Sequence, residues 1–267
     1  MSRIPLGQIT EYREKYAPEV LFPIARSEAR EALGLGSALP FSGADLWNAW
    51  ELSWLDDSGK PVVATATITV PADSRNIVES KSMKLYLGSL AMTRYASAAE
   101  VVAVLQNDLG SVTGGDVDVR LCTDGSRQAV GMLPGRCVDD LAFANSRDDV
   151  DPALLAATDD FVAESLHTHL LRSLCPVTGQ PDFGSVMLRY EGPRITPGSF
   201  LEYVVSYRAH HDFHEACVER MFLDIKRECR AEKLTVYARY TRRGGIDINP
   251  FRSDFEADIP NTRLWRQ

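Results

Sequence analysis

The sequence contains Ser53-Trp-Leu-Asp-Asp-Ser-Gly-Lys-Pro61 and, 120 positions later, Ser173-Leu-Cys-Pro-Val-Thr-Gly-Gln-Pro181. A second pair of similar stretches, SMKLYLGS at residues 82–89 and SFLEYVVS at residues 199–206, is offset by 117 positions. Shared Ser, Gly, Pro or Tyr residues occupy the same places within each pair. Because the two offsets are so close, a small insertion or deletion separates two halves of similar plan. We therefore expect an internal duplication.

The elements predicted around these stretches recur in the same order. In the first half, residues 62–70 alternate as a strand does, Ser97 and Glu100 signal the start of an apolar helix, and residues 117–121 form a returning strand. In the second half, residues 184–190 and 234–240 are strand-like and flank apolar residues at helical spacing. Each half is expected to combine strands with helices.

The join between the halves is expected at residues 148–157, where Asp148, Asp149, Asp151 and Pro152 give the polar, proline-containing composition of a linker. The domains would then be residues 46–150 and 151–267. Residues 1–45 have no counterpart in the repeat and carry four prolines. An irregular N-terminal arm is expected there.

The chain of 267 residues carries 29 Lys and Arg against 37 Asp and Glu, a net charge of −8. An acidic total disfavours binding to nucleic-acid backbones and anionic membranes, and no apolar run approaches the ~20 residues of a membrane-spanning helix. The five cysteines are odd in number and lack CxxC spacing, which is typical of a reducing compartment. We expect a cytoplasmic protein whose partners include neither nucleic acid nor membrane.

The two halves differ in their reactive side chains. The second half has Cys175 and Asp182 where the first has apolar residues in the overlay. The first half instead carries Glu79 and Lys81, with no acid or base at the matching positions of the second. A duplicated scaffold can keep its fold while its chemistry diverges. We therefore expect one composite active site.

Four motifs follow one another between residues 79 and 250. They are Glu79-Ser-Lys-Ser-Met-Lys-Leu-Tyr86, Leu174-Cys-Pro-Val-Thr-Gly-Gln-Pro-Asp182, Asp212-Phe-His-Glu215 and Tyr240-Thr-Arg-Arg-Gly-Gly-Ile-Asp-Ile-Asn-Pro250. Together they resemble the QueF family of NADPH-dependent 7-cyano-7-deazaguanine reductases in its long, two-domain form.

This resemblance implies an α+β fold of tandem tunnelling-fold (T-fold) domains, each an antiparallel sheet with helices packed on one face. It implies a homodimer or a higher homo-oligomer. The implied reaction reduces the nitrile of 7-cyano-7-deazaguanine to an aminomethyl group in the biosynthesis of the tRNA nucleoside queuosine. NADPH would be the cosubstrate, and no metal would be required.

A nitrile carbon accepts hydride poorly, so covalent catalysis by a thiolate would ease its reduction. Cys175 is the expected nucleophile and would form a thioimide. Asp182 is the expected acid and base, which takes the thiol proton and protonates the imine nitrogen. Without its motif, Cys175 would be interpreted as an inert buried thiol. The other four cysteines are expected to be core or surface thiols.

The resemblance assigns substrate binding to Val78, Glu79, Ser80, His214 and Glu215. A carboxylate suits a deazaguanine because it can accept hydrogen bonds from the ring N–H and the exocyclic amine together. Glu215 could instead be the capping partner of Asp212 at a helix start. Glu79 could be a solvated charge at a strand end. His214 could act as a general acid or only pack.

No G-x-G-x-x-G follows a predicted strand, so a Rossmann domain is not supported. The resemblance places NADPH at Ser80, Lys81, Arg243 and Gly244. Cations and a Gly-Gly turn suit phosphate groups. The alternative for Arg243 and its neighbour Arg242 is an ordinary solvated turn.

His167 and His169 would face the same way on a strand, as two metal ligands do. A tetrahedral site needs more ligands than this pair, and no Cys lies at ligand spacing, so we expect no metal site. Two other functions stay open: a zinc-dependent T-fold enzyme of the cyclohydrolase type, and a non-catalytic purine-binding T-fold protein.

Overall fold

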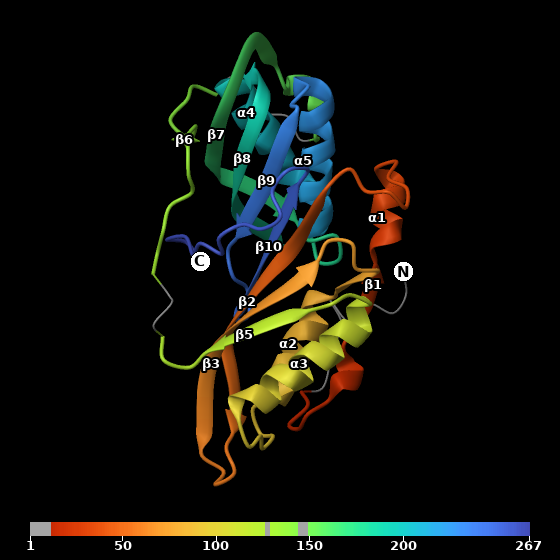
Figure 1. Cartoon of the computed structure of the whole chain (residues 1–267), viewed down its shortest axis with the longest axis vertical. Helices are drawn as coiled ribbons and strands as arrows, with labels where there is room; N and C mark the ends of the chain where they lie inside the picture. Colours follow the sequence, from red (N-terminus) through yellow and green to blue (C-terminus); the bar gives the residue numbers. More distant parts are fainter. Residues whose placement is uncertain (1–11, 126–128, 144–148) are drawn as a thin grey trace. The chain divides into compact units, whose positions relative to one another are not determined.

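A computed structural model describes residues 12–125, 129–143 and 149–267 and divides the chain into two compact units (Figure 1). Unit 1 comprises Met1–Gly36, Asp45–Ala129 and Arg242–Ile248. Unit 2 comprises Ser37–Ala44, Val130–Thr241 and Asn249–Gln267. The first eleven residues of the expected arm and Asp148 of the expected linker lie outside the described residues.

The two units do not follow the domain boundaries expected at residues 45 and 150, because each unit includes segments from both sides of them. Two strands are the cause, because β2 (Ser42–Leu55) begins in unit 2 and continues in unit 1, while β10 (Ile246–Ser253) begins in unit 1 and ends in unit 2. The described residues between 130 and 150 also belong to unit 2. The described residues of the expected arm are divided between the units in the same way.

Unit 1 has a sheet in the order β5–β3–β2, followed by the first residues of β10, and a separate antiparallel pair of β1 and β4. Helices α2 and α3 lie along one face of the larger sheet (Figure 1). Its elements are η1 (Pro18–Val20), β1 (Pro23–Ala25), α1 (Arg26–Ala32), β2, β3 (Pro61–Pro71), β4 (Asn76–Val78), α2 (Ser80–Ser89), α3 (Ala98–Thr113) and β5 (Asp118–Cys122). The core includes Trp47, Ile68, Met83, Tyr86 and Leu105.

The predicted helix of the first half is confirmed as α3. Ser97 is its N-cap, and the Ser97 side chain accepts a hydrogen bond from the backbone N–H of Glu100 at 3.2 Å. This bond satisfies one of the donors left unpaired at a helix start. The helix ends at Thr113 because Gly114 adopts a left-handed φ of 68°.

Unit 2 has a sheet in the order β6–β7–β8–β9, followed by the last residues of β10. The β7–β8, β8–β9 and β9–β10 pairs are antiparallel, and the short β6 runs parallel to β7. Helices α4 and α5 lie on one face of this sheet (Figure 1). Its elements are β6 (Arg136–Cys137), η2 (Pro152–Leu154), β7 (Ala157–Leu174), β8 (Pro181–Ile195), α4 (Pro197–Val205), η3 (Ser206–Ala209), α5 (His214–Cys229), β9 (Lys233–Tyr240) and β10.

The α+β fold class is confirmed, with antiparallel sheets and helices packed on one face. The stretches that match in sequence also match in structure. Residues 53–61 and 173–181 join β2 to β3 and β7 to β8, residues 82–89 fall on α2, and residues 199–205 fall on α4. Descent by duplication stays a prediction, and this shared order of elements supports it.

Candidate active site

The thiol of Cys175 lies in the turn between β7 and β8. Cys175 follows the last residue of β7, its N–H donates to the carbonyl of Gln180 at 2.9 Å, and its own carbonyl accepts from the N–H of Gly179 at 3.0 Å. Gly179 has a φ of 65°, a conformation that favours glycine. Cys175 is only 7% exposed. The turn thus holds the thiol in a fixed, largely buried position.

Asp182 lies on the other arm of the same hairpin. It pairs across the strands with Ser173, and Pro181 pairs with Leu174. Residues opposite one another in an antiparallel pair share a face, and alternation brings the second residue beyond Ser173, which is Cys175, to that face as well. The hairpin therefore sets the thiol and the carboxylate on one side although seven residues separate them in sequence.

His214 completes this group from the first position of α5. Its Nε2 is 3.4 Å from Oδ2 of Asp182, and its ring is stacked on that of Tyr240, with centroids 3.6 Å apart. The Nδ1 atom is buried and has no hydrogen-bond partner among the described residues. An imidazole in this position can hold the carboxylate and exchange a proton with it.

The start of α5 is tied to the residue that precedes the thiol. The N–H of Leu174 donates to the carbonyl of His210 at 2.8 Å, and the N–H of Asp212 donates to the carbonyl of Leu174 at 3.1 Å. These two bonds form a short parallel bridge between the end of β7 and the loop before α5. The motif around Cys175 and the motif around His214 are therefore neighbours in space.

Glu215 is buried in the first turn of α5, with 4% of its surface exposed. The N-cap of α5 is Phe213, which makes no side-chain capping bond, and the Asp212 side chain accepts from the adjacent N–H of Phe213 and lies 3.6 Å from His210 Nε2. Asp212 is therefore not the N-cap of α5, and the alternative of a capping pair between Asp212 and Glu215 stays a prediction.

Two other ionisable groups of this region stay protonated at neutral pH. Burial raises the pKa of Tyr240 well above its usual value, and the charge of Asp182 adds to the shift. Burial likewise raises the pKa of Cys217 well above that of an ordinary thiol, and Asp212 adds to that shift. Cys217 is therefore a poor nucleophile, as expected of a core thiol.

In unit 1, Glu79 is the N-cap of α2, directly after β4. Its two carboxylate oxygens accept hydrogen bonds from the N–H groups of Lys81 at 2.7 Å and Ser82 at 2.8 Å. Glu79 is 1% exposed, so the alternative of a solvated charge is wrong. Val78 is also buried, and Ser80 and Lys81 are half-buried.

Arg243 and Gly244 lie in a tight turn of the same unit. Gly244 and Gly245 have φ values of 57° and 77°, and Arg243 N–H donates to the Ile246 carbonyl at 2.9 Å. Paired left-handed residues of this kind form a type I′ hairpin turn. A β-carbon on Gly244 would lie 3.1 Å from the Lys84 side chain, so the turn packs against α2.

The cations near this turn come from two segments. Lys81 and Lys84 are three residues apart on α2 and share a helix face, and the guanidinium of Arg242 lies 5.1 Å from the ring centre of Trp50. Sequence reasoning did not assign Lys84 a role. Its spacing from Lys81 was the signal that could have identified it. These cations and an exposed glycine turn suit the phosphate groups of a dinucleotide.

The predicted site residues fall into two groups. Unit 2 holds Cys175, Asp182, His214 and Glu215, and unit 1 holds Val78, Glu79, Ser80, Lys81, Arg243 and Gly244. The structure places His214 against Asp182, with Cys175 in the turn of the same hairpin, and it places the glycine turn against Lys84 of α2. Tyr240 belongs with the first group and was not assigned a role from the sequence.

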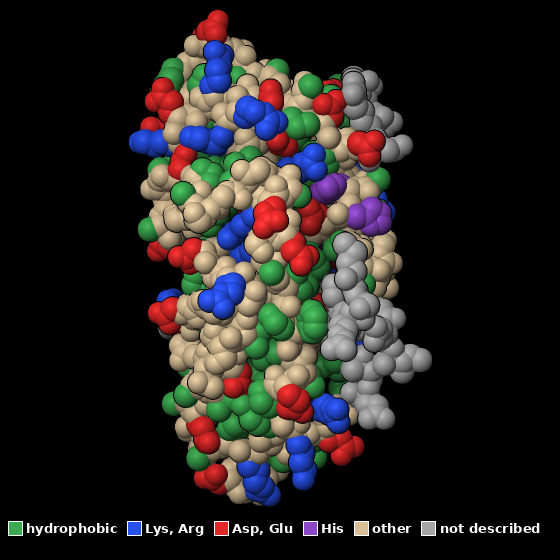
Figure 2. Space-filling model, turned by 90° about the vertical axis from the view of Figure 1, so that its right-hand side faces the viewer, with side chains coloured by type: hydrophobic (Ala, Val, Ile, Leu, Met, Phe, Trp, Pro, Cys, Tyr) green, Lys and Arg blue, Asp and Glu red, His purple; other side chains and the backbone are tan. Residues whose placement is uncertain are grey.

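Neither the surface charge nor the helices indicate a membrane-spanning segment in the described part of the chain. On the face drawn in Figure 2, basic and acidic side chains are interspersed. Every helix in the described part of the chain is too short or too polar to span a membrane.

Family models match both parts of the chain. Residues 12–121 match the model described as "Nitrile reductase, 7-cyano-7-deazaguanine-reductase N-term", and residues 181–258 match the model described as "QueF-like protein". A solved structure, the archaeosine synthase QueF-Like in the apo form, is 18% identical and covers 38% of this chain and 96% of its own, with a TM-score of 0.31.

Two curated relatives carry the same name, NADPH-dependent 7-cyano-7-deazaguanine reductase. The protein of Azoarcus sp. (strain BH72) is 52% identical over 93% of this chain and 90% of its own length. The protein of Saccharophagus degradans is 51% identical over the full length of both chains. The matching motifs, the two family models and these relatives lead to one conclusion: the chain belongs to the family of NADPH-dependent 7-cyano-7-deazaguanine reductases.

Proposed function

We propose that this protein reduces the nitrile of 7-cyano-7-deazaguanine to the aminomethyl group of 7-aminomethyl-7-deazaguanine, with NADPH as the hydride donor. The observation that carries the proposal is the grouping of a buried thiol, a buried carboxylate and an imidazole at one end of the β7–β8 hairpin. Family membership supports the same reaction. The product would serve in queuosine biosynthesis.

In the first step, the sulfur of Cys175 adds to the nitrile carbon. Asp182 takes the thiol proton and passes it to the nitrile nitrogen, which gives a neutral thioimide and leaves Asp182 ionised again. His214, with its Nε2 3.4 Å from Asp182, holds the carboxylate toward this proton transfer. Burial of the thiol and the carboxylate excludes water that would otherwise compete.

Two reductions complete the reaction. One hydride and one proton convert the thioimide to a tetrahedral aminothioether, and loss of the Cys175 sulfur as a thiol leaves an imine. A second hydride and a second proton reduce the imine to the amine. The balance is two NADPH and two protons consumed per amine, and the thiol is regenerated.

For substrate recognition we propose Val78, Glu79, Ser80, His214 and Glu215. Glu215 is buried and directly follows His214 in the first turn of α5, so a ligand bound against His214 would lie near both residues. Glu79 caps α2 through both oxygens, and each oxygen keeps a second lone pair that can accept from the base.

For the cosubstrate we propose Ser80, Lys81, Arg243 and Gly244, with Lys84 as an additional contact. When bound, NADPH supplies the hydride. These residues neutralise phosphate charge, and the glycine turn lets backbone N–H groups approach a phosphate closely. A cytoplasmic location and a homo-oligomeric state are part of the same proposal.

The test measures NADPH oxidation and amine formation together when the purified protein is given 7-cyano-7-deazaguanine. We expect two NADPH consumed per amine, and no turnover in Cys175→Ala. A cyclohydrolase would turn over only with bound zinc and would leave NADPH unchanged. A binding protein would bind the base equally well after thiol alkylation. Either result would overturn the proposal.

A further inference from the structure

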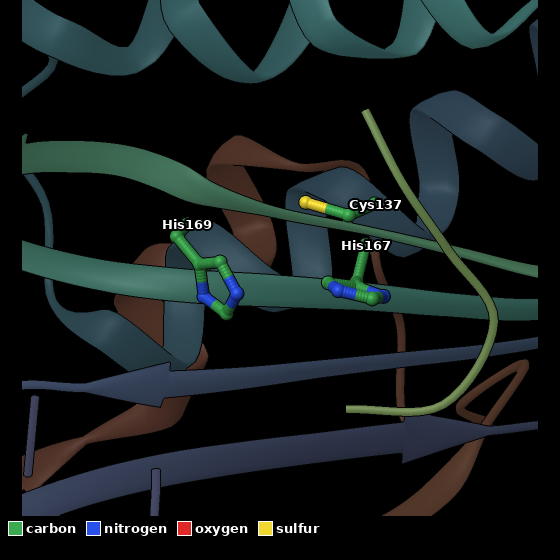
Figure 3. Close-up of side chains that lie close together, drawn as sticks. All are labelled: Cys137, His167 and His169. Atoms are coloured by element: carbon green, nitrogen blue, oxygen red, sulfur yellow. The ribbon is translucent and has the colours of Figure 1, made fainter. Parts of the chain in front are cut away.

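We propose that unit 2 contains a second ligand site, a binding site for one zinc-like divalent cation formed by Cys137, His167 and His169. The donor atoms of these three side chains all lie within 4.8 Å of one another. Figure 3 shows the two imidazoles on β7 and the thiol beside them, on β6. Nothing in the proposed reduction uses this cluster.

Strand pairing explains how the cluster forms. β6 runs parallel to β7 with Cys137 in register with His167, so their side chains share a face. His169 is two residues further along β7 and returns to that face. No Cys lies at ligand spacing in the sequence, and the separation of 30 positions between Cys137 and His167 therefore concealed the third side chain.

The segment carrying Cys137 is held closely against β7. Gly135 has a φ of 84°, and a β-carbon there would lie 2.1 Å from the carbonyl oxygen of Ser165. Beyond the thiol, the N–H of Val138 donates to the carbonyl of His167 at 3.0 Å. The Asp139 carboxylate accepts from the hydroxyl of Thr168 at 2.6 Å. These contacts hold the chain against β7 on both sides of Cys137.

Each imidazole is oriented by a bond through its Nδ1 atom. His167 Nδ1 lies 3.0 Å from the carbonyl oxygen of Pro134, and His169 Nδ1 lies 2.7 Å from the hydroxyl of Ser185. A carbonyl can only accept, so His167 carries its proton on Nδ1 and keeps a lone pair on Nε2. Ligand histidines in metal sites are oriented in this way by outer partners.

The donor set selects the class of ion. One thiolate and two imidazoles suit zinc and similar transition metals rather than magnesium or calcium, which prefer oxygen. Bonds of about 2.0 and 2.3 Å in a tetrahedron put donors roughly 3.3–3.6 Å apart, so the side chains must draw in by no more than about 1.5 Å. Three protein ligands leave a fourth position, and Cys137 is exposed, so water can fill it.

This site is separate from the proposed catalytic group. His167 and His169 precede Cys175 by eight and six residues, which at about 3.3 Å per residue is roughly 20–25 Å along β7. The inference therefore does not depend on the proposed reaction. Binding would replace the thiol proton of Cys137 by the metal, and it would fasten β6 to β7.

The test uses full-length protein treated with a chelator, desalted, and titrated with Zn²⁺ in competition with a chromophoric chelator. We expect one Zn²⁺ per chain, and with Co²⁺ an absorption band from thiolate-to-cobalt charge transfer. Cys137→Ser should remove that band and weaken Zn²⁺ binding at least tenfold, while Cys122→Ser and Cys175→Ala should bind as the unmodified chain does. Ser185→Ala should weaken binding by about tenfold, because it removes the outer partner of His169.

Thermal unfolding gives a second readout. Zn²⁺ should raise the melting temperature of the unmodified chain but not that of Cys137→Ser, whose melting temperature without metal should be unchanged because the side chain is exposed. The proposal is overturned if the unmodified chain binds no stoichiometric Zn²⁺, if Cys137→Ser binds it equally well, or if Cys175→Ala abolishes binding.

Discussion

The imidazole of His214 lies flat on the phenol ring of Tyr240, with centroids 3.6 Å apart and planes 5° from parallel. Tyr240 is fully buried at the end of β9, and its strand neighbour on β8 is Gly184. A β-carbon on Gly184 would lie 3.2 Å from the Tyr240 ring. The β-sheet thus holds the Tyr240 ring in place, and the Tyr240 ring supports the His214 imidazole. That imidazole lies against Asp182.

Replacement of Tyr240 tests this chain of contacts. Tyr240→Leu should lower kcat by between about twofold and tenfold, the value of an aromatic contact of this kind, with little change in the KM for NADPH. Tyr240→Phe keeps the ring and should stay close to the unmodified enzyme. Steady-state kinetics of both variants decide the matter. Equal losses in the two variants would show that the hydroxyl matters instead of the stacking.

Asp182→Asn preserves shape but removes the proton acceptor. We expect kcat to fall by roughly 10²–10⁴-fold, the range for general acid and base catalysis, and formation of the Cys175 adduct to slow with it. The matched control is Asp160→Asn, an exposed aspartate on β7. Rapid-mixing mass spectrometry measures adduct formation directly. If Asp182→Asn forms the Cys175 adduct at an unchanged rate, Asp182 does not take part in the first step.

Glu79→Ala should destabilise the protein. Loss of an N-cap side chain costs about 0.5–2 kcal/mol in the free energy of unfolding, and the carboxylate accepts two backbone bonds at once. Glu19→Ala, at an exposed acid in unit 1, should change that free energy by less than about 0.5 kcal/mol. Urea denaturation measures both variants. A stable Glu79→Ala protein would mean that the cap contributes little.

Lys84→Met tests the proposed cosubstrate contact. Loss of a charge-assisted bond to phosphate should raise the KM for NADPH roughly tenfold while kcat changes little. Lys60→Met removes an exposed lysine from unit 1 outside this region and serves as the control. An unchanged KM in Lys84→Met would exclude Lys84 from the NADPH site.

Gly244→Ala tests the turn itself. The residue has a φ of 57°, and the added β-carbon would press on Lys84 at 3.1 Å. Strain at a left-handed residue costs about 1–2 kcal/mol, so we expect a raised KM for NADPH together with a lower melting temperature. A normal KM would show that the turn tolerates the side chain and is not shaped for the cosubstrate.

The features that could be predicted from the sequence depend on local signals. Ser97 and Glu100 define the start of α3, and alternation defines β3 and β9, because capping and strand periodicity act over a few residues. The nearness of Cys175 to Asp182 also depends on local structure, since one hairpin turn separates them, but their choice as site residues depended on the resemblance and stays a prediction.

The features that were missed depend on pairing between distant segments. β10 was not expected as a strand because polar residues interrupt its apolar ones, yet Asp247 is buried and accepts a bond from the amide of Asn48 at 2.7 Å. Arg252 is buried against Glu219, with 2.9 Å between Nη2 and Oε1. A sequence alone does not reveal which partner satisfies a buried charge, and the same limit concealed Cys137 beside His167.

The central claim is that Cys175 attacks the nitrile, and intact-protein mass spectrometry tests it most directly. Protein incubated with 7-cyano-7-deazaguanine and without NADPH should gain the full mass of one substrate molecule per chain, and peptide mapping should locate that gain on Cys175. Addition of NADPH should remove it. If the unmodified protein gains no mass, or if Cys175→Ala gains as much, then catalysis through a thioimide at Cys175 is contradicted.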